Sequence, residues 1–161
     1  MSAGRTAAHT GAVDELAEPA RALADGIVAA LPGWVERSVE ERYRAALGPP
    51  PPDVVDAARA AGVEARQEVG ASVRALLEAD VDEQRTTPLS IVRGAVVYPT
   101  RVLAAAGVPP HPRDPLDRAM FPDDTYGLTP ASFADLDPQL TDVAIAWGAA
   151  KAWVHRRRHG P

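Results

Sequence analysis

Residues 13–34 read VDELAEPARALADGIVAALPGW, and this stretch sets the fold class of the chain. Apolar side chains recur in it in alternating steps of three and four residues, at Val13, Leu16, Ala20, Leu23, Ile27, Ala30 and Trp34. This spacing places them along one face of an α-helix. Pro19 suits the first turn of such a helix, whereas Pro32 followed by Gly33 predicts its end.

The same helical period continues beyond Trp34. It predicts further helices at about 34–47, 53–82, 87–106, 115–121, 129–136 and 138–157. The pair Thr87-Pro88 is a typical helix start, and Gly107 is a typical stop. Pro99 lies inside one of these helices and predicts a kink there. No stretch alternates with the period of two that a β-strand requires.

These elements predict an all-α fold, an irregular bundle of about six to seven helices with a proline-rich ordered loop segment. We expect a disordered tail at residues 1–11 and an acidic, Ala-rich helical bundle at residues 12–83. Residues 86–157 are expected to form a helical core with Pro, Asp and aromatic loops, because six of the eight aromatic residues lie at or after position 98. The two helical parts are expected to form one compact unit.

Charge and composition exclude several classes of protein. The formal net charge is −5, and no face is expected to be strongly basic, which argues against a nucleic-acid binder. The absence of cysteine excludes disulfides, thiolate catalysis and cysteine-ligated zinc. We expect neither a secretory leader, because the first ten residues are small and polar, nor a membrane span, because no apolar run is long enough. We therefore expect a cytoplasmic protein that does not enter a membrane.

Motifs of the common enzyme classes are also missing. The chain contains no GxSxG nucleophile turn, no Walker-type glycine loop, no GxGxxG and no HExxH. The segment around Asp124 lacks the spacing and the terminal Glu of an EF-hand calcium loop. The sequence therefore predicts no catalytic residues, no metal site and no cofactor, and it leans against an enzyme.

Most of the remaining chemistry lies in residues 98–138, where prolines, Asp, Arg, aromatics and the one mid-chain His come together. Turns that carry polar groups are a common way for a helical scaffold to present a site. The candidate residues for a binding or structural network are Arg93, Tyr98, Arg101, His111, Arg113, Asp114, Asp117, Arg118, Asp123, Asp124 and Tyr126.

Each group of candidates has two interpretations. The Asp residues with His111 could bind a divalent metal or act as acid and base, or they could cap the helix at Pro115 and form turns. The Arg residues could bind phosphate or carboxylate groups, or they could pair with the Asp residues and lock the loop. Tyr126, Phe121 and Phe133 could line an apolar pocket or anchor the core. In each case we expect the structural alternative.

The run from His155 to His159, HRRRH, is the one strongly basic stretch. It could contact RNA, DNA or an acidic partner, or it could stabilise the end of a helix through the helix dipole. Trp147 and Trp153 lie close by, and we expect one of them in the core and the other exposed at an interface.

Five short segments together form a pattern that is similar to that of known proteins. They are Thr87-Pro88-Leu89-Ser90, Tyr98-Pro99-Thr100, Phe121-Pro122-Asp123-Asp124, Tyr126-Gly127-Leu128-Thr129-Pro130 and Trp147-Gly148-Ala149-Ala150-Lys151-Ala152. Over residues 86–157 this pattern resembles a small, uncharacterised helical protein family common in actinobacteria. All Lys and Arg positions except Lys151 are Arg, and Asn is absent. Both features agree with the composition of a high-GC bacterium. The resemblance implies no activity.

The function that these observations favour is a non-enzymatic, cytoplasmic interaction or regulatory module that acts through a protein partner. The apolar stripe of the 53–82 helix could also serve homodimerisation. A first alternative is a small metal- or phosphometabolite-binding protein or enzyme that uses the 98–126 loop. A second is weak nucleic-acid contact through the Arg tail at residues 156–158.

Overall fold

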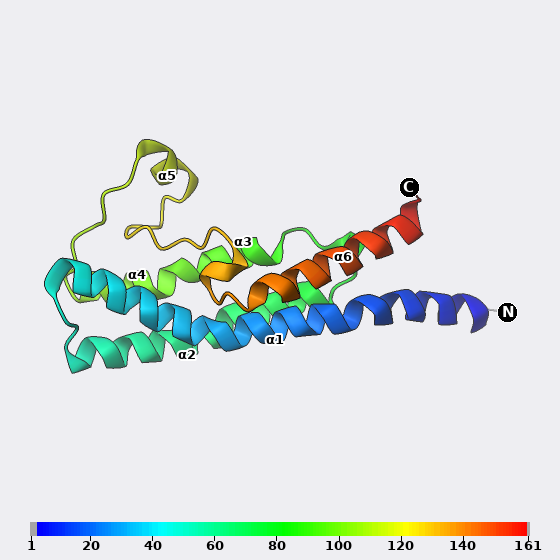
Figure 1. The fold of residues 1–161 in the computed structure, drawn as a ribbon, viewed down its shortest axis with the longest axis horizontal. Coiled ribbons are helices and arrows are strands. Elements are labelled where there is room, and N and C mark those ends of the chain that lie inside the picture. The colour runs from blue at the N-terminus through cyan, green and yellow to red at the C-terminus, as the bar shows by residue number, and fades with distance from the viewer. Residues whose placement is uncertain (1–2, 161) are drawn as a thin grey trace.

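The computed structural model describes residues 3–160, with side chains described from residue 15 onward. The regular secondary structure of this part is all helical and includes no strand, which confirms the all-α fold class. Figure 1 shows α1 and α2 running antiparallel along the length of the molecule. The α-helices are α1 (Ala3–Leu47), α2 (Pro52–Glu78), α3 (Pro88–Arg93), α4 (Val97–Ala105), α5 (Pro115–Met120) and α6 (Leu140–His159).

The long α1 corrects the prediction that Pro32 and Gly33 end the first helix. The helix runs through both Pro19 and Pro32, so residues 34–47 continue it instead of forming a second helix. Leu31 and Val35 are fully buried on either side of the proline. Their contact with one continuous core stabilises the helix against the loss of a single backbone hydrogen bond at Pro32.

The division into helices also differs from the sequence prediction. The predicted 87–106 helix is α3 and α4 joined by a 3₁₀ turn (Gly94–Val96) that lies just before Pro99. Pro99 has no N–H to donate to the carbonyl four residues earlier. The loss of this helical hydrogen bond accounts for the 3₁₀ turn just before it. The predicted 129–136 helix is only a 3₁₀ turn (Phe133–Asp135). With α3 and α4 counted as one, residues 3–160 form five helical segments in place of six or seven.

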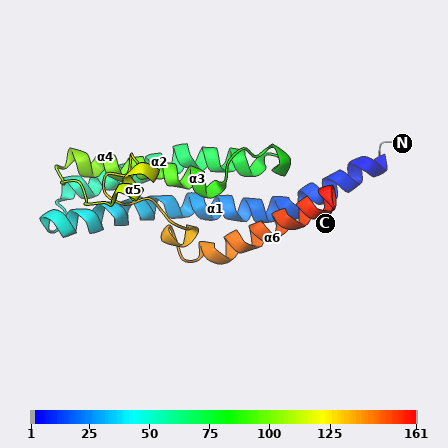
Figure 2. The same cartoon turned by 90° about the horizontal axis from the view of Figure 1, so that it is seen from above.

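The core lies between the two long helices and takes side chains from both halves of the chain. Figure 2 shows α6 on one side of α1, with α2, α3 and α4 on the other. The main buried cluster includes Leu23, Ile27, Leu31 and Val35 from α1, Val69 and Val73 from α2, and Val92, Tyr98, Leu140 and Trp147 from later helices. Trp147 is the buried tryptophan of α6, whereas Trp153 is half-buried and lies beneath Arg157.

The apolar stripe of α2, considered above for homodimerisation, lies against α1. The buried residues of α2 are Val54, Ala58, Ala61, Gly62, Ala65, Val69, Gly70, Val73 and Leu77, whereas Val55, which the predicted stripe includes, is exposed. At Gly62 the two helices approach so closely that an added Cβ would lie 3.0 Å from the Cα of Pro32. Small residues in the stripe therefore set the distance between α1 and α2.

Two further predictions from the sequence concern the N-terminal tail and membrane-spanning helices. Residues 3–11, for which we expected a disordered tail, belong to α1, while residues 1–2 and the side chains up to residue 14 lie outside the described part. Within the part that the structure describes, no helix combines the length and the apolar character needed to cross a bilayer.

Candidate functional site

The candidate loop leaves the bundle after α4 and carries α5 away from it, as Figure 1 shows. Gly107 adopts a φ of 78°, which favours glycine and ends α4. Asp114 caps α5, since its Oδ1 accepts a hydrogen bond of 2.8 Å from the backbone N–H of Asp117. This cap confirms the structural interpretation of Asp114. No residue of α5 is buried.

The carboxylate of Asp124 holds the returning arm of the loop. Asp124 is only 4% exposed. One oxygen accepts from the backbone N–H of Leu128 at 2.7 Å. The other accepts from the N–H and the hydroxyl of Thr129, at 2.8 and 2.7 Å. Three short hydrogen bonds on a buried carboxylate fix the turn around Gly127, whose φ is 68°.

Two arginines bind backbone carbonyls in place of the loop carboxylates. Arg113 donates to the carbonyls of Asp117 and Phe121, both at 2.7 Å. Arg93 donates to the carbonyls of Pro130 and Ala131, at 3.1 and 3.3 Å. The predicted Arg–Asp pairing is therefore wrong for both residues. Carbonyls at a helix end and in a turn lack helical partners, and a guanidinium group satisfies two of them at once.

Tyr126 anchors the loop to the second buried cluster of the protein. It is 2% exposed, and its hydroxyl donates to the carbonyl of Val108 at 2.8 Å. Burial raises the pKa of Tyr126 above its usual range. Phe133 packs on the main core and Phe121 lies under Arg93 at 5.8 Å, so the three aromatics do not line one pocket.

His111 and Tyr98 connect to other parts of the molecule. Nη1 of Arg42 lies 2.9 Å from Nδ1 of His111, and since arginine only donates, Nδ1 accepts and ties the loop to α1. The hydroxyl of Tyr98 donates to a carboxylate oxygen of Glu68 on α2. Arg101 lies over the ring of Tyr98 at 5.6 Å. Tyr98 is thus part of the helix core and lies apart from the loop.

We expect the environment of Tyr98 to make the protein sensitive to alkaline pH. Burial, together with the hydrogen bond to Glu68, raises the pKa of Tyr98 from 10.0 to about 12. A raised pKa in the folded state means that full stability is present below about pH 10 and is lost as the pH rises toward about 12. Denaturant unfolding should show a loss of about 1.4 kcal/mol by about pH 11 from this group.

The variant Tyr98→Phe provides the control for this pH effect. It cannot ionise, so its free energy of unfolding should fall less than that of the wild type between about pH 9 and about pH 11. An equal fall in both proteins would assign the alkaline sensitivity to other groups.

Besides His111 and Asp114, the exposed polar side chains of the loop include Asp117, Arg118 and Asp123. They lie beside two large apolar side chains of α5, Leu116 (67% exposed) and Met120 (59% exposed). A surface cavity of about 580 Å³ lies between the loop and Arg93. The side chains of Arg113 and Asp124 at this cavity are bound to backbone groups, so they present little free polar chemistry to a ligand.

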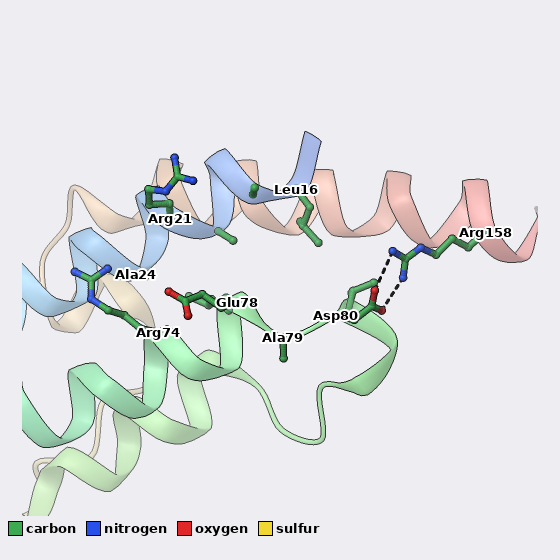
Figure 3. Close-up of a pocket in the computed structure, with 12 residues that line it drawn as sticks. Leu16, Arg21, Ala24, Arg74, Glu78, Ala79, Asp80 and Arg158 are labelled. Atoms are coloured by element: carbon green, nitrogen blue, oxygen red, sulfur yellow. Dashed lines mark hydrogen bonds and ion pairs between the residues drawn. The ribbon is translucent and has the colours of Figure 1, made fainter. Parts of the chain in front are cut away.

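A second cavity, of about 400 Å³, lies near the other end of α1, between α1, the end of α2 and α6 (Figure 3). Its apolar wall includes Leu16, Ala20 and Leu77. Arg74 and Arg158 also line it, and both are engaged in ion pairs. The pair between Arg74 and Asp25 measures 2.8 Å.

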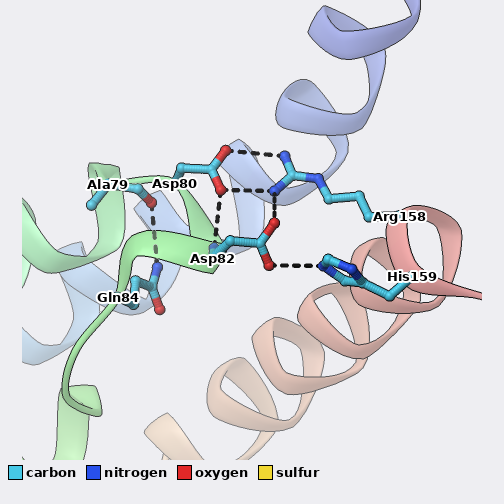
Figure 4. A network of polar contacts seen from close by, with 6 residues as sticks. All are labelled: Ala79, Asp80, Asp82, Gln84, Arg158 and His159. Carbon is cyan, nitrogen blue, oxygen red and sulfur yellow. Dashed lines mark hydrogen bonds and ion pairs between the residues drawn. The ribbon is translucent and has the colours of Figure 1, made fainter.

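Beside this cavity, four polar side chains form a network shown in Figure 4. Arg158 binds both oxygens of Asp80, at 2.7 and 3.1 Å, and one oxygen of Asp82 at 3.0 Å. Nε2 of His159 lies 3.1 Å from the other oxygen of Asp82. The hydrogen bond with His159, assisted by Arg158, lowers the pKa of Asp82, and hydrogen bonding to Asp80 raises the pKa of Arg158.

Sequence reasoning did not find this network. It treated residues 155–159 as a basic run, although two His residues four apart on a helix are themselves a signal of a shared face. Asp80 and Asp82 lie more than 70 residues earlier in the chain, and no sequence pattern linked them to the run. Because Arg158 is paired and Arg157 lies 4.6 Å from the ring of Trp153, only part of the run is free to contact an acidic partner.

Comparison with protein-family models, with curated proteins and with solved structures finds no match for this chain. The resemblance of residues 86–157 to an actinobacterial family therefore stays a prediction.

Proposed function

We propose that this chain is a non-enzymatic, cytoplasmic interaction module, and that α5 docks into an apolar groove of a different protein. The observation that carries the proposal is a helix that buries none of its own residues and exposes Leu116 and Met120 on a loop held in one shape. Residues four apart lie on one helix face, which is the spacing of anchors in helix-in-groove recognition.

The rigidity of the loop supports this role. Asp114, Asp124 and Tyr126 each use their polar groups to fix the backbone that carries α5. An ordered loop loses little entropy when it binds, so such a loop can contribute more net affinity than a flexible one. Isolated exposed apolar residues are common on proteins, but a pair on one face of a projecting helix is typical of a docking element.

The charged side chains around α5 indicate what kind of groove the partner would offer. The exposed charged side chains around Leu116 and Met120 are three acidic residues, Asp114, Asp117 and Asp123, and one basic residue, Arg118. This acidic excess complements a groove with a basic rim.

The two alternative functions receive less support. A metal or phosphometabolite site in the 98–126 loop needs unpaired polar groups, whereas Arg113, Asp114 and Asp124 are engaged with the backbone. Nucleic-acid contact through the C-terminal run needs free arginines, and Arg158 is paired with two carboxylates.

The first experiment places a photoreactive amino acid at position 116 and, as a matched control, at position 145. Ile145 is also exposed, at 65%, but it stands alone on α6. Irradiation in the native cells should give one main protein adduct from position 116 and none of the same mass from position 145. That adduct is then purified, and its affinity for the chain is measured.

In this reconstituted pair, Leu116→Asp and Met120→Asp should each weaken binding by about thirtyfold or more, as expected for anchor residues. Ile145→Asp should bind as the wild type does. If the adduct is a second copy of this chain, or if Leu116→Asp binds normally, α5 does not dock into another protein and the proposal fails.

A further inference from the structure

We propose that Asp82, His155 and His159 bind one divalent transition-metal ion of the Zn²⁺ type, and that this ion ties α6 to the turn that follows α2. The site lies at the opposite end of the molecule from α5, as Figure 1 shows for the helices that carry the two regions. It is therefore independent of the proposed docking function.

The first argument is the convergence of three ligand atoms. One nitrogen of His155, one nitrogen of His159 and one carboxylate oxygen of Asp82 all lie within 4.8 Å of one another. They form the one such group of His and acidic side chains among the residues whose side chains the structure describes. Ligand atoms around a single zinc ion stand about 3–4 Å apart, given metal–ligand distances of about 2.0–2.2 Å. All three side chains are exposed, so small rotations close the difference.

The second argument is the helical spacing of the two histidines. His155 and His159 are four residues apart on α6, and their ring centroids lie 4.6 Å apart. Two His residues at this spacing on one helix face are a recurrent pair of zinc ligands. His159 lies in the last turn of the helix, where the helix dipole favours a cation, and His155 lies just before that turn.

The third argument is that the carboxylate is held in position. The backbone N–H of Asp82 donates to Asp80 at 3.0 Å, and Arg158 donates to one oxygen of Asp82 at 3.0 Å. The other oxygen of Asp82 faces His159 (Figure 4). Hydrogen bonds of this kind orient metal-binding carboxylates in known sites. Coordination through Nε2 of His159 would replace the hydrogen bond that this nitrogen now shares with Asp82.

The types of donor atom indicate which ions suit the site. Two imidazole nitrogens and one carboxylate oxygen suit Zn²⁺, Ni²⁺ or Cu²⁺ better than Mg²⁺ or Ca²⁺, which prefer oxygen ligands. Three protein ligands leave a tetrahedral ion one position for water.

The test uses the full chain without a polyhistidine tag, titrated with Zn²⁺ and separately with Ni²⁺ in a calorimeter. We expect one ion per chain. Each of Asp82→Asn, His155→Gln and His159→Gln should weaken binding by about tenfold or more. His111→Gln is the matched control, because His111 is an exposed histidine far from the site, and its binding should equal that of the wild type.

A thermal melt separates binding at this site from adventitious binding. Among the described residues, His155 makes a ring contact with His159 but no side-chain hydrogen bond, so His155→Gln should fold as the wild type does without metal. Zn²⁺ should raise the Tm of the wild type and leave that of His155→Gln nearly unchanged, because only binding to the folded state stabilises it. If neither ion binds, or if all three ligand variants bind as tightly as the wild type, the proposal is overturned.

Discussion

Replacing Asp124 with Ala should lower the free energy of unfolding by about 3 kcal/mol, because a buried carboxylate with three short hydrogen bonds is removed. The substitution leaves two backbone N–H groups, of Leu128 and Thr129, without their acceptor in a part-buried turn. Hydrogen bonds to a charged group are worth about 1.5–3 kcal/mol each, but their removal together is not additive. Chemical denaturation followed by far-ultraviolet circular dichroism measures this change.

The neighbouring residue gives the matched control. Asp123 is exposed and makes no hydrogen bond among the described residues, so Asp123→Ala should change the stability by no more than about 0.5 kcal/mol. Both substitutions remove one negative charge, so a difference between them isolates the buried hydrogen bonds from the change of net charge. Equal losses for the two variants would mean that Asp124 does not fix the turn.

The same variant links the stability of the loop to its proposed function. Asp124 is buried, so it cannot contact a partner of α5 directly. If a rigid loop is what presents Leu116 and Met120, Asp124→Ala should still weaken partner binding, because the loop must then be ordered on binding. Asp123→Ala should leave the affinity close to that of the wild type.

Signals within a few residues of one another allowed correct prediction of part of this structure. Thr87 and Asp114 each cap a helix whose first residue is a proline, and a cap depends only on the next three residues. The buried positions Leu140, Trp147 and Val154 follow from a spacing of seven along α6. In both cases the residue and its partner lie in one short segment, so the pattern determines the contact.

Features that depend on distant partners were missed. Pro32 was expected to end a helix, but contact with α2 lets α1 continue through it. Arg113 was expected to pair with carboxylates, because a sequence shows acidic side chains but not which carbonyls lack a partner. Asp82 and His159 lie 77 residues apart, and only the packing of α2 and α6 along α1, with their C-terminal ends on the same side of the molecule, brings them together.

The position where Pro32 meets α2 supports the second large prediction: Gly62→Val should destabilise the protein by about 3 kcal/mol. A Cβ at residue 62 would lie 3.0 Å from the Cα and 3.1 Å from the carbonyl oxygen of Pro32. These are backbone atoms of another helix, so they cannot rotate away as a side chain can, and α1 and α2 must separate. Gly62→Ala meets the same contact with fewer atoms and should lose less stability.

Gly148→Ala is the control for the variants at Gly62. It separates the effect of the close contact with Pro32 from the effect of replacing a glycine inside a helix. Gly148 also lies inside a helix, α6, but a Cβ added there would meet no atom of another described segment within 4 Å. Alanine is favoured over glycine in a helix by about 0.8–1.0 kcal/mol, so Gly148→Ala should stabilise the protein. Denaturation measurements on the two alanine variants should therefore give opposite signs. Stabilisation by Gly62→Ala would mean that α1 and α2 are not in close contact at Pro32, and the continuous α1 would then need another explanation.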